Sequence, residues 1–136
     1  LDSVPRHLGS VWHVNCNSMP AVSRVISEEG PGKTRAAFVL GDRDGTTCSP
    51  IFADMVARFL RERGYSVTLN DPYKGAEIVR RYADPPARRH CLQIEINRGL
   101  YMDEMTRERA AGFMKLQDDM AALVRFLAGY VRTAIA

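Results

Sequence analysis

The chain has 136 residues, of which 46% are hydrophobic and 26% charged, and its formal net charge is +3. This length suits one domain with one core, and the composition is that of an ordinary globular protein. The basic residues are scattered and no apolar run is long enough to cross a bilayer, so the sequence favours neither nucleic acid nor a membrane as partner.

The three cysteines, Cys16, Cys48 and Cys91, are odd in number and far apart in the sequence. None belongs to a Cys-x-x-Cys pair, which argues against a zinc ribbon and against a disulfide scaffold. Free thiols and the absence of a recognisable signal peptide predict a cytoplasmic protein.

The first part of the chain predicts a lead-in over residues 1–9, a strand over residues 10–16 and a loop over residues 22–35. The strand alternates between two sets of side chains, as a half-buried strand does. The loop is rich in charged residues and glycine, which predicts a mobile, solvated segment.

A buried strand is predicted at residues 36–40, followed by a turn at residues 41–45. The next helix should open at Ser49, which can cap it, and end before Gly64. Its apolar stripe repeats at helical spacing. The stripe consists of Ile51, Phe52, Met55, Val56, Phe59 and Leu60.

A further strand is predicted at residues 65–69 and a loop at residues 70–75. One or two helical turns at residues 77–82 should be stopped by the prolines that follow Asp84. Near the end of the chain, one long helix is predicted from residue 106 to about residue 135, with its apolar stripe in the core. That stripe consists of Phe113, Leu116, Met120, Leu123, Val124, Leu127, Val131 and Ile135.

The stretch from His90 to Glu104 organises the rest of the chain. Its first half alternates between an apolar row and a polar row of Gln93, Glu95 and Asn97. A polar row on a buried strand needs partners or carries function, which makes Glu95 a candidate general base. The alternative is that Glu95 lies on an edge strand with its polar face in water. Strands alternating with helices indicate an α/β protein with helices on both faces of the sheet.

Three blocks of this sequence, in the same order, resemble the N-formylglutamate amidohydrolase family. The resemblance extends from about residue 9 to about residue 104. It implies a fold related to zinc carboxypeptidases and aspartoacylases, a three-layer αβα hydrolase fold whose mixed sheet is mostly parallel. It places Glu95 on a strand near the sheet centre. It also implies that residues 1–136 are the C-terminal portion of a longer amidohydrolase domain. The blocks are Leu40-Gly41-Asp42-Arg43-Asp44-Gly45, Asn70-Asp71-Pro72-Tyr73-Lys74-Gly75, and Leu92-Gln93-Ile94-Glu95-Ile96-Asn97-Arg98 followed by Leu100-Tyr101-Met102-Asp103-Glu104.

The family resemblance implies metal-dependent hydrolysis of a small acidic N-acyl amino acid, with N-formylglutamate giving glutamate and formate. Glu95 would move the proton of the attacking water. An acidic substrate needs cations to orient it. The residues implied at the substrate are Arg43, Arg80, Arg98, Asn97, Tyr73 and Lys74. For Arg43 the alternative is a surface ion pair with Asp42 or Asp44.

One position departs from the family pattern. The family strand ends in Cys-His-Ser-Met-Pro, with the histidine as a zinc ligand, whereas this chain has Asn17 there. A carboxamide is a poor zinc ligand, and the family's Pro-His motif and acidic partner are not found in this chain either. We therefore expect no tight zinc binding by this chain. A catalytically inactive fragment or relative, which keeps the fold and an acidic-ligand pocket, is the alternative function.

Overall fold

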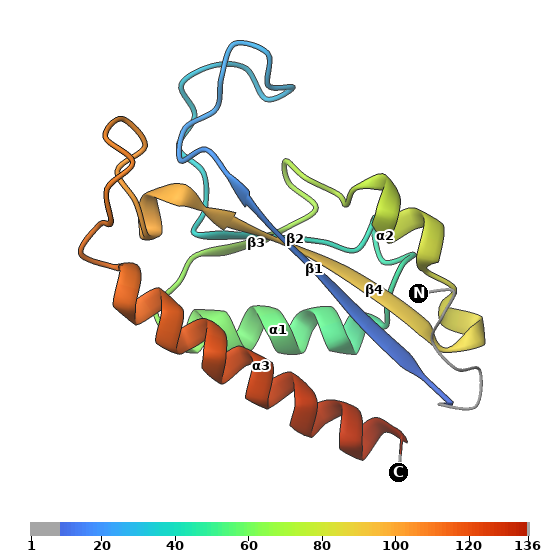
Figure 1. Ribbon diagram of the computed structural model, residues 1–136. Helices are drawn as coiled ribbons and strands as arrows, with labels where there is room; N and C mark the ends of the chain where they lie inside the picture. Colours follow the sequence, from blue (N-terminus) through green and yellow to red (C-terminus); the bar gives the residue numbers. More distant parts are fainter. Residues whose placement is uncertain (1–8, 136) are drawn as a thin grey trace.

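The computed structural model describes residues 9–135, so the predicted lead-in lies almost wholly outside the described residues. The four strands are β1 (Val11–Met19), β2 (Phe38–Gly41), β3 (Val67–Leu69) and β4 (Arg89–Asn97). They form one sheet in the order β1-β4-β2-β3 (Figure 1). β4 is parallel to β1 and antiparallel to β2, and β2 is parallel to β3. The predicted mixed, mostly parallel sheet is confirmed.

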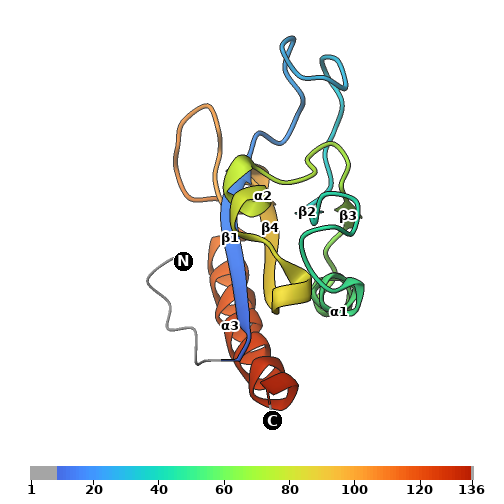
Figure 2. The ribbon, with the colours of Figure 1, turned by 90° about the vertical axis from the view of Figure 1, so that its right-hand side faces the viewer.

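The helices are α1 (Pro50–Glu62), α2 (Glu77–Tyr82) and α3 (Phe113–Ile135), with short 3-10 turns at Pro85–Ala87 and Arg98–Leu100. Helices α1 and α3 lie on one side of the sheet and α2 on the other (Figures 1 and 2). This arrangement is the predicted three-layer α/β architecture. Of the helices that the structure describes, none is long and apolar enough to cross a membrane.

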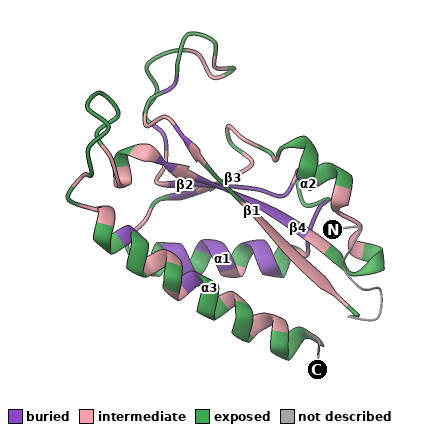
Figure 3. Ribbon diagram, viewed as in Figure 1, coloured by how far each residue is buried: buried purple, intermediate pink, exposed green. Residues whose placement is uncertain are grey.

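The hydrophobic core fills the space between the sheet and the layer of α1 and α3 (Figure 3). Leu92 and Ile94 of β4 contribute one side of it, and Phe52, Leu60 and Leu123 of the two helices contribute the other. All five side chains are at most 1% exposed. The apolar row of β4 thus faces the core, as its alternation predicts.

The polar row of β4 is also buried, and β4 has a neighbouring strand on each side. Gln93 is 3% exposed, and Glu95 and Asn97 are each 8% exposed. The edge-strand interpretation of Glu95 is therefore wrong. The edges of the described sheet are β1 and β3.

Helix α1 differs from its prediction at its first turn. Ser49 occupies the N-cap position but makes no side-chain capping bond; its N–H donates to Nδ1 of His90 at 3.1 Å instead. Ile51, predicted in the stripe, is 67% exposed because it lies on the first turn away from the sheet. The predicted end is confirmed: Gly64 has a φ of +89° and its N–H donates to the carbonyl of Arg61.

Strand β1 continues to Met19, three residues past its predicted end, because its register with β4 runs on to Asn97. Strand β3 is shorter than predicted and begins at Val67. The three cysteines are free thiols, as predicted, and Cys48 and Cys91 are buried.

Helix α3 begins at Phe113 rather than at residue 106. The carboxylate of Asp103 accepts the N–H groups of Met105 and Thr106 at 2.8 and 3.0 Å, which stabilises a turn in place of a helix. A side chain at Gly112 would come within 2.5 Å of the Leu100 carbonyl, so the chain passes closely over the end of β4 before the helix starts.

The α3 stripe packs on the core as predicted from Leu116 to Leu127, with Val124 as its exposed member. Leu116 and Leu123 are buried, at 7% and 1% exposure. Leu127 is half-buried against the core, whereas Val124, directly after the buried Leu123, is 65% exposed. The side chain of Ile135 lies outside the described part of the chain.

We predict that Leu123→Ala lowers the free energy of unfolding by about 2–4 kcal/mol, the usual cost of a large cavity in a core. Val124→Ala, one position along the same helix, should change it by less than about 0.5 kcal/mol because the side chain is exposed. Urea unfolding followed by circular dichroism measures both. Equal effects of the two changes would show that α3 packs on a different face.

Candidate active site

Two parallel strands supply the floor of the candidate site. In the register of β1 and β4, Asn15 lies opposite Gln93 and Asn17 opposite Glu95. Side chains of directly paired residues point to the same face of a sheet, so these four polar groups share the face away from the core. Nε2 of Gln93 donates to Oε1 of Glu95 at 2.8 Å, and Nδ2 of Asn15 lies 3.4 Å from Oε1 of Gln93.

Burial raises the pKa of the Glu95 carboxyl above its ordinary value. The carboxamides of Asn17 and Gln93 and the positive charges of Arg98 and Arg35 act in the opposite direction, but the loss of hydration outweighs them. A carboxylate whose pKa moves toward neutrality accepts a proton more readily than a fully hydrated one. Glu95 is therefore the chemically distinctive group of this face.

A cavity of about 640 Å³ lies over Glu95. Two loops, residues 26–29 and residues 72–76, supply its walls, and Gln93 and Glu95 belong to its floor. Of the residues that the family resemblance implies at the substrate, Tyr73 and Lys74 line this cavity. The full lining is Ile26, Ser27, Glu28, Glu29, Pro72, Tyr73, Lys74, Gly75, Ala76, Gln93 and Glu95.

The loops at residues 41–45 and 70–75 interlock beside this cavity. The N–H of Asp42 donates to Oδ1 of Asn70 at 3.0 Å, and Nδ2 of Asn70 donates back to Oδ1 of Asp42 at 2.8 Å. A Cβ at Gly41 would come within 2.7 Å of the backbone of Lys74 and Gly75, so only glycine permits this approach. Two of the three family-like blocks thus form one unit.

This unit places Arg43. Its N–H donates to the carbonyl of Lys74 at 2.7 Å, and its Nη1 donates to the carbonyl of Gly75 at 2.8 Å. Among the described residues, Arg43 forms no ion pair with either neighbouring aspartate: Asp42 bonds Asn70, and Asp44 pairs with Lys74 at 2.8 Å. A guanidinium has five donors, so Arg43 keeps capacity for an anion beyond this carbonyl.

Arg98 approaches Glu95 from the opposite end of the polar row. Because β2 runs antiparallel to β4, Gly41 at the end of β2 pairs with Gln93, whereas Arg98 follows the last residue of β4. Five residues of strand, or about 16 Å of backbone, separate these two points. Nε of Arg98 donates to Oγ of Ser18 at 3.2 Å, and its Nη1 lies 4.0 Å from Oε2 of Glu104.

Asn97 makes its hydrogen bonds to the backbone. Its Oδ1 accepts the N–H of Gly99 at 2.9 Å, and its Nδ2 donates to the carbonyls of Arg35 and Ala36 at 3.3 and 3.2 Å. These contacts join the end of β4 to the chain entering β2. Asn97 is engaged in holding the fold, and it does not line the cavity.

Arg80 lies on α2, where its Nε and Nη2 both donate to the carboxylate of Glu77. Both side chains are more than half exposed, at 59% and 67%. Arg80 does not line the cavity. Arg43, Arg98 and Asn97 are also absent from the lining, so Tyr73 and Lys74 are the members of the implied substrate group that line the cavity in the described part of the chain.

Arg35 is a residue of the site that sequence reasoning missed. Its side chain is 4% exposed, and its Nη2 donates to Oε1 of Glu29 at 2.7 Å. Nη1 donates to the carbonyl of Pro20 at 3.1 Å, and the guanidinium carbon lies 5.1 Å from the centre of the Tyr73 ring. The only signal in the sequence is an arginine placed directly before the apolar run of β2.

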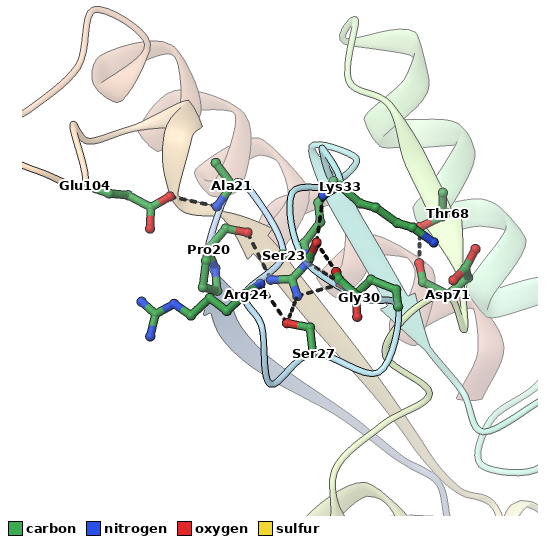
Figure 4. A network of polar contacts seen from close by, with 12 residues as sticks. Pro20, Ala21, Ser23, Arg24, Ser27, Gly30, Lys33, Thr68, Asp71 and Glu104 are labelled. Atoms are coloured by element: carbon green, nitrogen blue, oxygen red, sulfur yellow. Dashed lines mark hydrogen bonds and ion pairs between the residues drawn. The ribbon is translucent and has the colours of Figure 1, made fainter.

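The loop at residues 22–35 is irregular, as predicted, but two of its residues are buried rather than solvated. Besides Arg35, Ser23 is buried; its hydroxyl donates to the carbonyl of Gly30 and accepts the N–H of Lys33 (Figure 4). At the start of the loop, Glu104 accepts the N–H of Ala21 at 2.7 Å (Figure 4). The loop is thereby held in place beside the cavity.

The side chains around Asn17 do not fit a zinc ion. Its neighbours on the same face are the carboxamides of Asn15 and Gln93 and a single carboxylate, Glu95. Zinc in proteins is held by imidazole, thiolate and carboxylate groups, usually three of them in a catalytic site. Within residues 9–135, no three histidine, cysteine, aspartate or glutamate side chains come together in a group that could hold a metal.

Comparisons with known proteins relate this chain to one family. The family model described as N-formylglutamate amidohydrolase matches residues 1–102. Two relatives named N-formylglutamate deformylase, from Pseudomonas putida and Pseudomonas aeruginosa, are 38% identical over 68 residues, which is 49% of this chain and 26% of each relative. The crystal structure of an N-formylglutamate amidohydrolase from Ralstonia eutropha JMP134 is 50% identical, with a TM-score of 0.83. That match covers 93% of this chain and 46% of the solved chain, so this chain spans about half of its relative's length.

We predict that Asn97→Ala lowers the free energy of unfolding by about 2–3 kcal/mol, because it leaves buried backbone groups without partners. Asn97→Asp keeps the acceptor for Gly99 but turns a carboxylate oxygen toward two carbonyls, and it should destabilise at least as strongly at pH 7. Chemical denaturation measures both variants. Unchanged stability with weakened binding of an acidic ligand would assign Asn97 to the substrate instead.

Proposed function

The chain belongs to the N-formylglutamate amidohydrolase family, and we propose that it carries the proton-transfer and substrate-binding residues for hydrolysis of an N-acyl acidic amino acid such as N-formylglutamate. The observation that carries this proposal is the position of Glu95. It is a buried carboxylate with a raised pKa on the floor of a cavity large enough for a small molecule.

Glu95 acts as general base and then as general acid in this proposal. It takes a proton from a water molecule while the water oxygen attacks the acyl carbon. When the carbon–nitrogen bond breaks, Glu95 returns that proton to the leaving amine. The products are a carboxylic acid and the free amino acid, and Glu95 is regenerated as the carboxylate. Its raised pKa favours the first transfer, and the cavity supplies the space for the substrate.

The charges around the cavity support an acidic substrate. The charges of Arg98 and Arg35 act on Glu95, Arg43 is bonded to the carbonyl of Gly75 in the cavity wall, and Lys74 lines that wall. The pair between Lys74 and Asp44 is exposed, so exchanging it for a substrate carboxylate costs little. Of the two glutamates in the wall, Glu29 is paired with Arg35.

Asn17 favours a second candidate function, the binding of an acidic ligand without turnover. An amide in place of the family's histidine leaves a site whose ligand set does not fit zinc, while the cavity and its cations remain. This candidate shares its binding residues with the first and differs from it only in the chemical step.

We predict that Glu95→Gln lowers kcat for formate release from N-formylglutamate by about 100-fold or more, the scale of a positioned proton-transfer group. The change keeps the size of the side chain and its capacity for hydrogen bonds, so KM should change little. A coupled formate assay on both proteins measures this. Near-normal turnover by Glu95→Gln would remove Glu95 from the reaction.

The same ligand separates the two candidate functions. Calorimetry measures the binding of N-formylglutamate to the unmodified chain, and the formate assay measures its turnover. Arg43→Ala removes the arginine proposed to bind the substrate, and Arg80→Ala is the control because Arg80 is exposed and lies outside the cavity lining. Arg43→Ala should weaken binding about tenfold, the scale of one partly exposed charge-assisted bond. If the unmodified chain binds in this way and releases no formate, the second candidate is favoured. If the chain neither binds N-formylglutamate nor releases formate from it, both candidate functions are overturned.

A further prediction concerns zinc. After dialysis the chain should retain far less than one zinc per molecule, and Asn17→His alone should not restore tight binding, because a catalytic site usually needs three ligands. Elemental analysis of both proteins decides the point. About one zinc per chain, lost when residues beside Asn17 are changed, would contradict the prediction.

A further inference from the structure

Gln93 is a buried polar residue on the cavity floor that the proposed reaction does not yet use. We infer that Gln93 is a positioning residue: it fixes the direction of the Glu95 carboxylate and ties it to the cavity wall at Ala76. This inference rests on the proposed function for its role in the reaction, but its geometry stands independently.

The hydrogen bonds of Gln93 permit only one orientation of its carboxamide. Oε1 accepts the N–H of Ala76 at 2.7 Å, and Nε2 donates to Oε1 of Glu95 at 2.8 Å. Rotating the amide by 180° would bring its NH₂ group against the N–H of Ala76 and its carbonyl against the carboxylate. Both of those contacts are repulsive, so the donor toward Glu95 is fixed by chemistry.

The surroundings of Gln93 make these bonds strong. The residue is 3% exposed, and water competes little for its donors and acceptors. Asn15 lies on its other side, with Nδ2 at 3.4 Å from Oε1, a contact too long to set its direction. A buried, charge-assisted bond of this kind restrains the carboxylate at Glu95 more than an exposed one would.

Gln93 also connects the proposed base, Glu95, to Arg43, the arginine proposed to bind the acidic substrate. Arg43 donates to the carbonyl of Gly75, and the next N–H along the chain, that of Ala76, donates to Gln93. Gln93 then donates to Glu95. A continuous path of hydrogen bonds and one peptide unit therefore runs from the guanidinium of Arg43 to the proposed base.

The test measures the ionisation of Glu95 directly, by carbon-13 NMR of its side-chain carboxyl, with the signal assigned from the Glu95→Gln spectrum. Gln93→Met keeps the length of the side chain and removes the donor. It should raise the titration midpoint of Glu95 by about one pH unit, because the bond it removes favours the ionised form. Asn15→Ala, the control on the same face, should leave the midpoint unchanged. An unchanged midpoint in folded Gln93→Met would overturn the inference.

Ala76→Pro provides a second variant should Gln93→Met fail to fold. Ala76 has a φ of −72°, which proline adopts, and the change removes only the N–H that orients Gln93. It should move the midpoint in the same direction by a smaller amount, and no movement there would equally overturn the inference.

Turnover separates this inference from the proposed function. In Gln93→Met, the acidic limb of kcat/KM against pH should move upward with the NMR midpoint. If the midpoint moves and the limb does not, Gln93 has no role in the reaction. If Glu95→Gln turns over normally while the midpoint still moves, the proposed function fails and the link between Gln93 and Glu95 stands.

Discussion

The structure depends on a row of polar side chains buried in a central strand. Gln93, Glu95 and Asn97 lie on a central strand and are largely withdrawn from bulk water, so each needs a partner inside the protein. Gln93 and Asn97 find theirs in backbone groups of loops on either side. Glu95 is compensated only in part, since its pKa remains raised by burial. That incomplete compensation distinguishes Glu95 from its neighbours in the row and supports the proton-transfer role proposed for it.

The loops around this row are held by side chains rather than by regular structure. Arg43, Asp44 and Asn70 all adopt positive φ, at 49°, 59° and 58°, which is unfavourable for residues other than glycine. The reciprocal bonds between Asp42 and Asn70 stabilise this conformation. The loop at residues 22–35 is stabilised in a similar way by the ion pair between Arg35 and Glu29. Strain of this kind persists where the surrounding contacts determine the backbone, and it gathers here beside the cavity.

Asn17 changes the electrostatics of the face it shares with Glu95. A neutral carboxamide beside a buried carboxylate supplies a donor but no charge, so it offsets the loss of hydration less than a cation would. The nearest positive charges come from Arg98 and Arg35, which lower the pKa of Glu95 but do not outweigh burial. The buried carboxylate of Glu95 is thus paired across the strands with a neutral amide.

The sequence by itself determined the α/β class and the alternation of β4 that puts Glu95 in a polar row, because strand periodicity depends only on local geometry. It also located α2 to the residue and the glycine that ends α1. It could not determine the start of α3, where Asp103 forms a turn that competes with a helical pattern, or the exposure of Ile51 and Val124. The tertiary structure alone decided that Asn97 bonds backbone, that Arg80 pairs with Glu77, and that Arg35 is buried. Those outcomes depend on which distant segments meet, and residue type and spacing along the chain carry no information about such meetings.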